Sequence, residues 1–238
     1  MRGLYIEEAM NFLNSLNILS CDDNTPEALL SRWNSTSADA DAVMDNPHEY
    51  YKEWVGERGA SAIIANICDQ FSRQYILYAI LKYVRRHHDG CLLDYGCGTG
   101  ALSISFAKKY GYRVTLADLP NLSREFTQRM GTKWLSGRVQ YDGVELSESK
   151  DNAYDAIMCI DVLEHLTNPS EVMMLLNRKL RRRGILILQA PWGGHPEHLP
   201  EAPLDWFQYG GASLLASSYA CIEHLDPHIR LSGVYIKR

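Results

Sequence analysis

The sequence carries, between residues 91 and 100, the stretch Cys91-Leu92-Leu93-Asp94-Tyr95-Gly96-Cys97-Gly98-Thr99-Gly100. A short apolar run ends at the acid Asp94, and glycine then occupies every second position. Glycine accepts a positive φ and lets the backbone approach a ligand closely, at the point where the next helix presents unpaired N–H groups. The stretch therefore predicts a strand, a tight turn and a helix start, with a nucleotide-like cofactor on the turn.

The composition bounds the class of protein. The chain has 238 residues, a formal net charge of −5 and six cysteines. This length suits one α/β domain with an appendage. The cysteines are scattered without a C-x-x-C pair, which indicates reduced thiols. No apolar run approaches the ~18 residues that span a bilayer and no secretory signal is recognisable, so we expect a soluble, cytoplasmic protein. The negative charge argues against nucleic acid as a partner.

The first 88 residues are predicted to be helical. Apolar side chains recur at helical spacing over residues 1–18, 25–33, 47–55 and 60–86, and a polar stretch over residues 34–45 is typical of a hinge. We therefore expect residues 1–88 to form a helical extension that closes over the site as a lid. In this extension Tyr50, Tyr51 and Trp54 are predicted to contact the acceptor substrate.

Strands and helices alternate in the remainder, residues 89–238. Further strands are predicted over residues 113–118, 138–142, 154–161 and 184–190, with a helix over residues 162–181 between the last two. Such alternation predicts a doubly wound α/β fold around a mostly parallel, seven-stranded sheet. Two strand candidates in the tail, residues 217–222 and 231–236, are predicted to form an antiparallel pair at the sheet edge.

Five motifs in this order resemble those of the class I S-adenosylmethionine-dependent methyltransferases, which have a Rossmann-like fold. They are Leu92 to Gly100, Asp118, Tyr154 to Ile157, Asp161 to Leu166 and Gly184 to Ile187. The resemblance covers about residues 90–195. It is strongest to the group that methylates small molecules, including the ubiquinone-type O-methyltransferases. The helical first third matches no particular acceptor family, so the resemblance does not imply an acceptor.

The resemblance implies a site for S-adenosylmethionine, which leaves as S-adenosylhomocysteine. Asp94 and the loop residues Gly96, Cys97, Gly98 and Gly100 would hold the methionine part. Asp118 lies about twenty residues beyond the glycines, where an acid reaches ribose hydroxyls. Asp142 would accept from the adenine amino group, Tyr141 or Leu119 would pack on the ring, and Asp161 would face the same crevice.

Candidate catalytic and acceptor residues follow the fourth and fifth predicted strands. His165 is the side chain best suited to remove an acceptor proton near neutral pH, with Glu164 beside it, although the pair could also only brace the helix. Trp192, His195 and His198 lie in a loop that would reach over the acceptor. Glu164, His165, His195 and His198 together could hold a divalent metal. We expect no metal. The comparable metal-dependent enzymes carry a further acid before the Glu-His pair, and this chain lacks that acid at the matching place and has Asp161 instead.

The predicted function is methyl transfer to an oxygen or nitrogen of a small metabolite, by in-line displacement that depends mainly on proximity. One alternative is a nucleic-acid (RNA) methyltransferase, but the N-P-P-Y or D-P-P-Y motif of base aminomethylation is absent after the fourth strand. Another is the metal-assisted reaction, and a third is a non-catalytic binding protein on the same fold. A homodimer is an option that the sequence leaves open.

Overall fold

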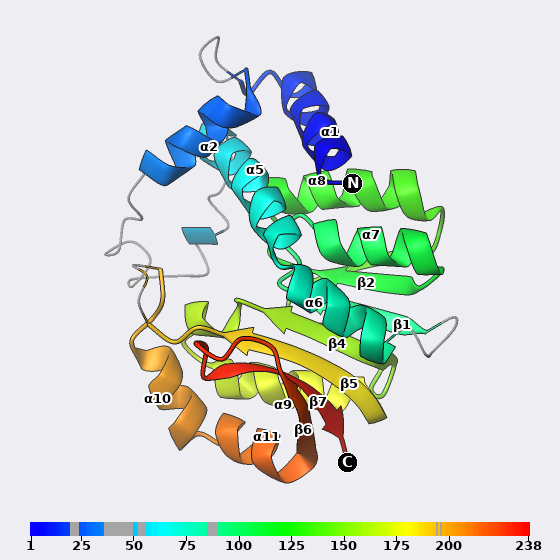
Figure 1. Ribbon diagram of the computed structural model, residues 1–238, viewed down its shortest axis with the longest axis vertical. Coiled ribbons are helices and arrows are strands. Elements are labelled where there is room, and N and C mark those ends of the chain that lie inside the picture. The colour runs from blue at the N-terminus through cyan, green and yellow to red at the C-terminus, as the bar shows by residue number, and fades with distance from the viewer. Residues whose placement is uncertain (20–23, 36–49, 52–55, 85–89, 194, 196) are drawn as a thin grey trace.

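The computed structural model describes residues 1–19, 24–35, 50–51, 56–84, 90–193, 195 and 197–238 (Figure 1). Its helices are α1 (Arg2–Ser15), α2 (Pro26–Ser35), α5 (Gly56–Ser72), α6 (Gln74–Ala79), α7 (Ala101–Tyr110), α8 (Leu122–Leu135), α9 (Pro169–Lys179), α10 (Glu201–Gln208) and α11 (Gly211–Ser218). Its strands are β1 (Cys91–Tyr95), β2 (Arg113–Ala117), β3 (Val139–Asp142), β4 (Tyr154–Ile160), β5 (Leu180–Ala190), β6 (Tyr219–His224) and β7 (Leu231–Lys237). A π-helical turn, Ile80–Val84, follows α6, and a 3-10 turn, Leu163–His165, follows β4.

The seven strands form one sheet in the order β3-β2-β1-β4-β5-β7-β6. The pairs β1–β2, β1–β4, β2–β3 and β4–β5 are parallel. Strand β7 runs antiparallel to both β5 and β6. This arrangement confirms the predicted doubly wound fold and the antiparallel pair in the tail. The order reverses between β1 and β4, and open α/β sheets bind ligands at such a switch point.

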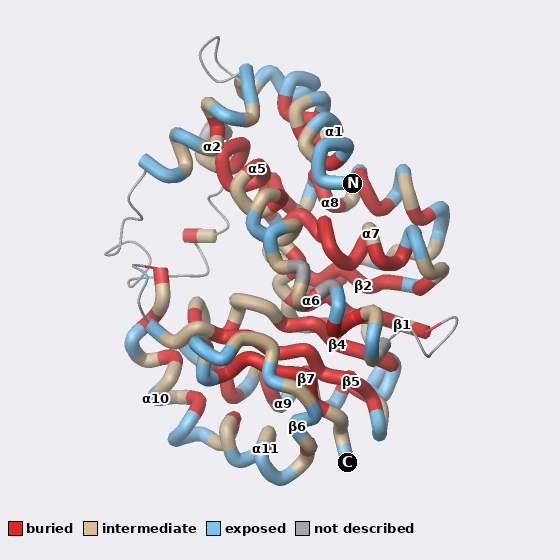
Figure 2. The backbone as a smooth tube through the Cα atoms, in the orientation of Figure 1, coloured by how far each residue is buried: buried red, intermediate tan, exposed pale blue. Residues whose placement is uncertain are grey.

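The central strands are mostly apolar because helices cover both faces of the sheet. Leu92, Ala156 and Ile185 face a core shared with α1, α5, α7 and α8. Their neighbours Leu93, Ile157 and Leu186 face a second core shared with α9. Figure 2 shows these strands buried between partly exposed helices. Strands buried on both faces have near-continuous apolar runs, which is why their sequences show no alternation.

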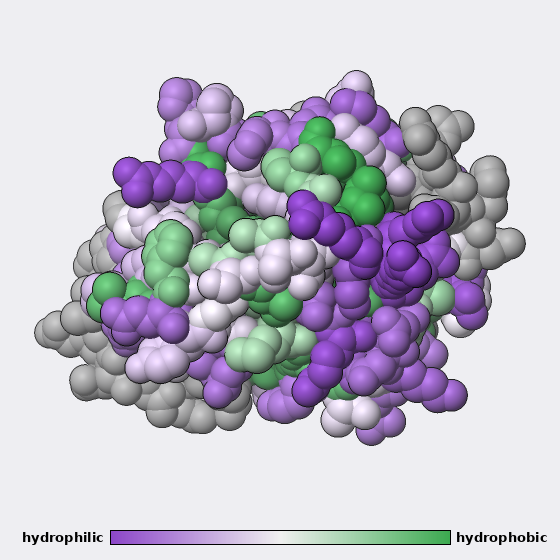
Figure 3. All heavy atoms as spheres, turned by 90° about the horizontal axis from the view of Figure 1, so that it is seen from below, coloured by the Kyte–Doolittle hydropathy of each residue, from purple (hydrophilic) through white to green (hydrophobic). Residues whose placement is uncertain are grey.

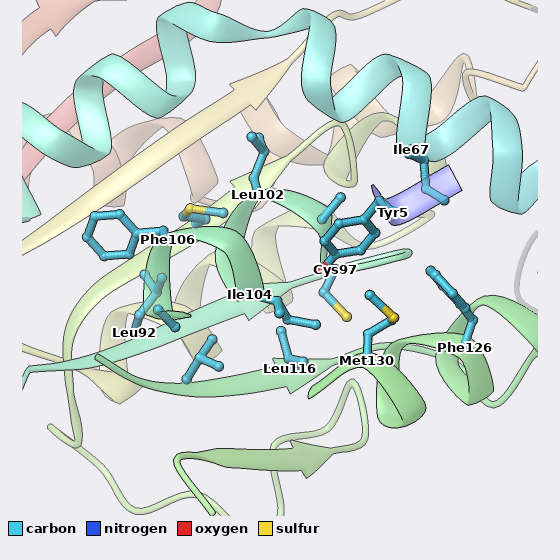
Figure 4. Packing of buried hydrophobic residues seen from close by; sticks show 14 of the residues in the cluster. Tyr5, Ile67, Leu92, Cys97, Leu102, Ile104, Phe106, Leu116, Phe126 and Met130 are labelled. Carbon is cyan, nitrogen blue, oxygen red and sulfur yellow. The ribbon is translucent and has the colours of Figure 1, made fainter. Parts of the chain in front are cut away.

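The N-terminal helix α1 packs into the same core as the glycine loop. Tyr5 is fully buried, and its ring makes edge contacts with Phe71, Phe126 and Trp134. Its hydroxyl donates to the carbonyl of Gly100 over 3.3 Å. Figure 4 shows Tyr5 lying among side chains of α5, α7 and α8. The helical extension therefore shares its core with the sheet, and the boundary predicted at residue 88 lies outside the described residues.

The predicted helix over residues 60–86 is wrong in its continuity, because the structure breaks it at Arg73. At this point the backbone hydrogen bonds span three residues and not four. Arg73 N donates to the Gln70 carbonyl, and Ile76 N donates to the Arg73 carbonyl. The Arg73 side chain is drawn into ion pairs with Asp69 and with Asp161 beyond β4. The break therefore comes from a tertiary contact that periodicity does not reveal.

The helix predicted over residues 162–181 is confirmed only over Pro169–Lys179, and its predicted ends are wrong. Pro169 disfavours a helical conformation at Asn168, so α9 begins only at Pro169 and a 3-10 turn precedes it. Strand β5 starts at Leu180, four residues earlier than predicted. The arginines at positions 181–183 consequently lie in β5, and not at a helix end.

Helices α10 and α11 occupy a stretch for which the sequence showed no clear element. They lie at the end of the molecule that Figure 3 views from below, where apolar and polar residues intermingle. Leu204, Phe207 and Tyr209 are exposed there, while Trp206 points into the second core. Among the described residues, no helix is both long and apolar enough to cross a membrane.

We expect Tyr5→Ala to lower the free energy of unfolding by about 3 to 5 kcal/mol, because it empties a buried aromatic site. Tyr5→Phe, which removes only the hydroxyl contact with Gly100, should cost about 0.5 to 1.5 kcal/mol. Urea unfolding followed by far-UV circular dichroism measures both losses. A separate early transition that carries the whole effect of Tyr5→Ala would show that the N-terminal helices fold independently of the sheet.

Candidate active site

A cavity of about 940 Å³ lies where the carboxyl ends of β1, β2 and β4 meet α5 and α9. Gly96 and Gly98 line it after β1, Asp118 after β2, and Asp161 after β4. This is the edge and the switch point at which open α/β sheets bind their ligands. A volume near the upper end of the usual range for ligand pockets leaves room for a nucleotide and a small second substrate.

The glycine loop forms the floor of the cavity. Gly96, Gly98 and Gly100 have φ values of 69°, 53° and 61°. A Cβ at Gly96 would collide with the side chain of Val162, so a larger residue would both strain the backbone and clash. This close packing leaves the loop backbone facing the cavity, as a cofactor cradle requires.

Asp118 holds the loop from the end of β2. One carboxylate oxygen accepts from Gly98 N at 2.6 Å and the other from Leu119 N at 2.7 Å. Burial raises the pKa of Asp118, although these donors act against the rise. Asp118 and Leu119 both line the cavity. The predicted ribose and ring contacts are therefore compatible with where these two residues lie.

Asp94 lies inside β1, buried beneath the loop, and is not among the residues that line the cavity. Burial, and to a smaller extent the charge of Asp118, raises its pKa to about 7. Cys97 is buried in the first core and also lies behind the lining. Burial raises the pKa of its thiol well above the usual value, so the thiol remains protonated.

The structure places two of the three predicted adenine residues, Asp142 and Tyr141, behind the cavity wall. Asp142 is only 3% exposed, and its oxygens accept from Gly143 N and from the Ser149 hydroxyl, each at 2.8 Å. The Tyr141 hydroxyl donates to the carbonyl of Gln128. Val144 and Glu145, the residues just after this strand, line the cavity instead. The contact of Asp142 with the adenine amino group stays a prediction.

Asp161 is held in a strained conformation by an ion-pair network. Its φ is 53°, a left-handed value that is uncommon for a residue with a side chain. One oxygen accepts from Gln189 Nε2 at 2.9 Å, and the other pairs with Arg73. The same guanidinium contacts Asp69 at 2.6 Å. Among the described residues that line the cavity, Arg73 is the sole lysine or arginine.

His165 lies at the cavity wall with one nitrogen tethered. Its Nδ1 is 2.8 Å from the main-chain carbonyl of Glu197 and 2.8 Å from the Tyr51 hydroxyl. A carbonyl oxygen only accepts, so the Nδ1 proton points to it and Nε2 carries the lone pair. Burial lowers the pKa of His165, which favours the neutral ring. The arrangement leaves Nε2 able to accept a proton.

Glu164 is fully buried next to this histidine. Neither of its carboxylate oxygens has a hydrogen-bond partner among the described residues. Burial, reinforced by the charge of Asp161, raises its pKa well above the usual value. Ligand atoms of Glu164, His165 and His198 all lie within 4.8 Å of one another. These three could hold a divalent cation, and His195, the fourth predicted member, is not part of this group.

The predicted acceptor residues separate into two groups. Tyr51, His195 and His198 line the cavity. Tyr50 is buried behind it and donates to Glu197 Oε1 at 2.9 Å, while Trp192 packs towards Trp206. Trp54 and the predicted hinge at residues 36–45 lie outside the described residues, and Asn34 and Ser35, which the prediction placed in that hinge, belong to α2.

Sequence reasoning missed the polar residues of α5 and the buried Glu197. Asn66, Asp69 and Arg73 all line the cavity. With Gln70 they recur at i, i+3, i+4 and i+7, a spacing that predicts one helix face, and Arg73 directly follows the end of α5 at Ser72. This polar stripe in an otherwise apolar stretch was the signal that could have found them. Glu197 had no such signal, because its contacts come from residues far away in the sequence.

Comparisons with known proteins agree with this geometry. A family model described as "Methyltransferase domain" matches residues 69–229. The ubiquinone biosynthesis O-methyltransferase, mitochondrial, of Schizosaccharomyces pombe is 27% identical over 184 residues, which cover 76% of this chain and 66% of that protein. The ubiquinone biosynthesis O-methyltransferase of Xanthomonas oryzae pv. oryzae is 34% identical over 102 residues, 41% of each chain. The chain thus spans between 41% and 66% of the length of these curated relatives.

Two solved structures share the fold. An S-adenosylmethionine-dependent methyltransferase from Aquifex aeolicus aligns with a TM-score of 0.51 and 17% identity over 69% of this chain and 92% of its own. The PH0226 protein from Pyrococcus horikoshii aligns with a TM-score of 0.52 and 16% identity over 71% and 91%. At these sequence identities the alignments show that the fold is shared and nothing about function.

The switch-point cavity, the glycine cradle and the acid after β2 define a class I, Rossmann-like methyltransferase fold. Because the family model covers most of its length, the chain belongs to the methyltransferase domain family, and its cofactor is S-adenosylmethionine. The residues fit this cofactor, since Gly96, Gly98 and the acid Asp118 line the cavity, and close packing leaves no room for a Cβ at either glycine. The S. pombe relative is named mitochondrial, so the cytoplasmic compartment stays a prediction.

We expect Asp94→Asn to raise the free energy of unfolding of the ligand-free protein at pH 8 and to change it little at pH 4. At pH 8 the folded wild type holds a buried charge, whereas below the raised pKa of about 7 the folded carboxyl is protonated. Near pH 4 the unfolded carboxyl binds its proton too, so the penalty has disappeared. Urea unfolding at pH 4, 6 and 8 measures the difference.

Glu148→Gln is the matched control, because it neutralises an exposed acid. Its effect should be small at each pH. An Asp94→Asn effect that is the same at pH 4 and pH 8 would contradict a buried carboxyl with a raised pKa.

Proposed function

We propose that the protein transfers a methyl group from S-adenosylmethionine to a hydroxyl oxygen of a small-molecule acceptor, with His165 as the base. The observation that carries the proposal is the tethered imidazole, whose Nδ1 is held by the Glu197 carbonyl while Nε2 is left with a lone pair. The curated relatives cited above are named O-methyltransferases, which supports oxygen over nitrogen.

The cofactor supplies an electrophilic methyl group, so the residues of this chain have two tasks. They hold donor and acceptor at attack distance, and they take up the proton that the acceptor hydroxyl loses. His165 Nε2 is the candidate proton acceptor because burial keeps the ring neutral. Tyr51 would support the ring from the side of the N-terminal helices, through its contact with Nδ1.

The charge of the cavity wall favours an uncharged or cationic acceptor. The described lining residues include one cation, Arg73, and six acids. The acids are Asp69, Asp118, Glu145, Asp161, Glu171 and Glu197. Such a wall repels phosphates, so it disfavours an RNA acceptor. Val162, Leu166, Val172 and Leu175 add apolar surface to the part of the wall around α9. A small molecule with an apolar body and a hydroxyl group fits both features.

We expect His165→Ala to lower kcat by roughly 10²- to 10⁴-fold, since it removes the base. His198→Ala should act mainly by raising the acceptor KM, because His198 lines the cavity in which we propose that the acceptor binds. Formation of S-adenosylhomocysteine with a panel of small hydroxyl acceptors and matched amines measures both effects and identifies the atom methylated.

The exposed His224 in β6 gives the matched control, and His224→Ala should change neither parameter. Turnover of amines alone would overturn the assignment to oxygen. An unchanged kcat in His165→Ala would overturn its role as the base.

A metal-assisted reaction is the second candidate, because the buried and unpartnered Glu164 lies beside His165 and His198. His198 Nδ1 is 2.7 Å from the carbonyl of Gly193, which leaves its Nε2 for a ligand role. A cation would supply the opposite charge that the Glu164 carboxylate lacks. Neutral histidines and one carboxylate suit zinc or a similar divalent ion.

Under the proposed base mechanism we expect EDTA to leave kcat and KM unchanged. The metal-assisted candidate requires loss of turnover in EDTA, recovery with a divalent ion, and equal losses in Glu164→Ala, His165→Ala and His198→Ala. His195→Ala is the control for the metal ligands, since His195 is not part of the metal-ligating group and its loss should not match theirs. Elemental analysis of the purified protein completes the test.

A further inference from the structure

Helix α5 presents a polar stripe to the cavity. Its apolar side chains Ile63, Ile64 and Ile67 are buried in the first core. Asn66 and Asp69, on the other side, line the cavity. Asn66 also lies before residue 69, where the match to the methyltransferase domain model begins. Its contribution therefore belongs to the helical extension of this chain.

The orientation of the Asn66 amide is determined by its neighbours. Asn66 Oδ1 accepts from Thr99 N at 3.0 Å, from the Thr99 hydroxyl at 2.7 Å and from Gln70 Nε2 at 2.8 Å. A main-chain N–H can only donate, so the atom that faces Thr99 N must be the amide oxygen. The side-chain NH2 group consequently points away from Thr99.

This NH2 group has no hydrogen-bond partner among the described residues. It is not enclosed by protein either, because Nδ2 is absent from the buried atoms that lack a partner. A Cβ added to Gly98 would lie 2.9 Å from Nδ2, so the amide rests directly on the cofactor loop. Two uncommitted N–H donors thus lie at the cavity wall, beside a glycine that lines the same cavity.

The chemistry of the cofactor determines which acceptor group these N–H donors can bind. The cofactor carries one carboxylate, at its methionine end, and a carboxylate accepts hydrogen bonds from amide N–H groups. The other polar groups on this side of the cavity are Asp69, Asp161 and Arg73, and two of these three repel a carboxylate. We infer that the Asn66 NH2 group binds the cofactor carboxylate, while its oxygen anchors the loop at Thr99.

Two contributions of Asn66 therefore have to be separated. If the side chain only anchored the loop, its loss would weaken every ligand that sits on the loop. If the NH2 group also binds the carboxylate, a change confined to that group weakens only ligands that possess the carboxylate. Asn66→Asp makes this change, because a carboxylate accepts all three of the bonds that Oδ1 accepts and lacks the NH2 donors.

The test compares two ligands by calorimetry. S-adenosylhomocysteine has the carboxylate, and 5′-methylthioadenosine lacks the whole amino-acid end. We expect Asn66→Asp to raise the Kd of S-adenosylhomocysteine roughly 10- to 100-fold, as loss of a hydrogen bond to a charged group does. The Kd of 5′-methylthioadenosine should stay within about twofold. Asn14→Asp, which adds the same charge at an exposed position of α1 outside the cavity, should change neither Kd.

Equal weakening of both ligands by Asn66→Asp would overturn the inference and leave Asn66 as a loop anchor alone. An unchanged Kd for S-adenosylhomocysteine would overturn it too. If the wild type bound neither ligand, the cofactor assignment itself would fail, which is a different result from failure of Asn66. Should Asn66→Asp not fold, the wild-type Asn66 side-chain amide resonance is followed by ¹⁵N NMR. It should shift with S-adenosylhomocysteine and not with 5′-methylthioadenosine, and equal shifts would overturn the inference.

Discussion

The conformation of the loop from Gly96 to Gly100 is the constraint on which the rest of the site depends. Three positive φ values turn the backbone out of β1 and into α7, and the N–H groups of this turn require partners. Asp118 supplies one from β2 and Asn66 another from α5, while Tyr5 of α1 bonds the Gly100 carbonyl. The loop is therefore held by the sheet and by the helical extension together.

The second constraint is electrostatic and lies at the end of β4, the strand beside β1. Asp161 follows β4 in a left-handed conformation that costs free energy, and its pairing with Arg73 and Gln189 offsets that cost. Arg73 in turn interrupts the helix that would otherwise continue from α5 to α6. The break thus places a cation opposite the carboxyl ends of the strands, in a wall otherwise rich in carboxylates.

Much of the architecture was predictable because it follows from local patterns. The four parallel strands from β1 to β4 lie close to their predicted positions, since apolar runs and the turn residues after them are local signals. Asp118 could be found because it follows a strand at a known distance from the glycines. Arg73, Asn66 and Glu197 could not be placed in the site, since the long-range partners that bring them there lie 32 to 147 positions away in the sequence. Pro169 is a local signal for the start of α9.

By itself the sequence determined the class of fold, the cofactor loop and the acids at the strand ends, because glycine spacing and strand periodicity are properties of short segments. Only the tertiary structure decided which of those acids face the cavity. It places Asp118 and Asp161 on the wall and keeps Asp94 and Asp142 behind it. It also brings α5 onto the loop and Tyr51 and Glu197 onto His165. These contacts join segments that are distant in the chain, and packing of the helical extension against the sheet sets their geometry.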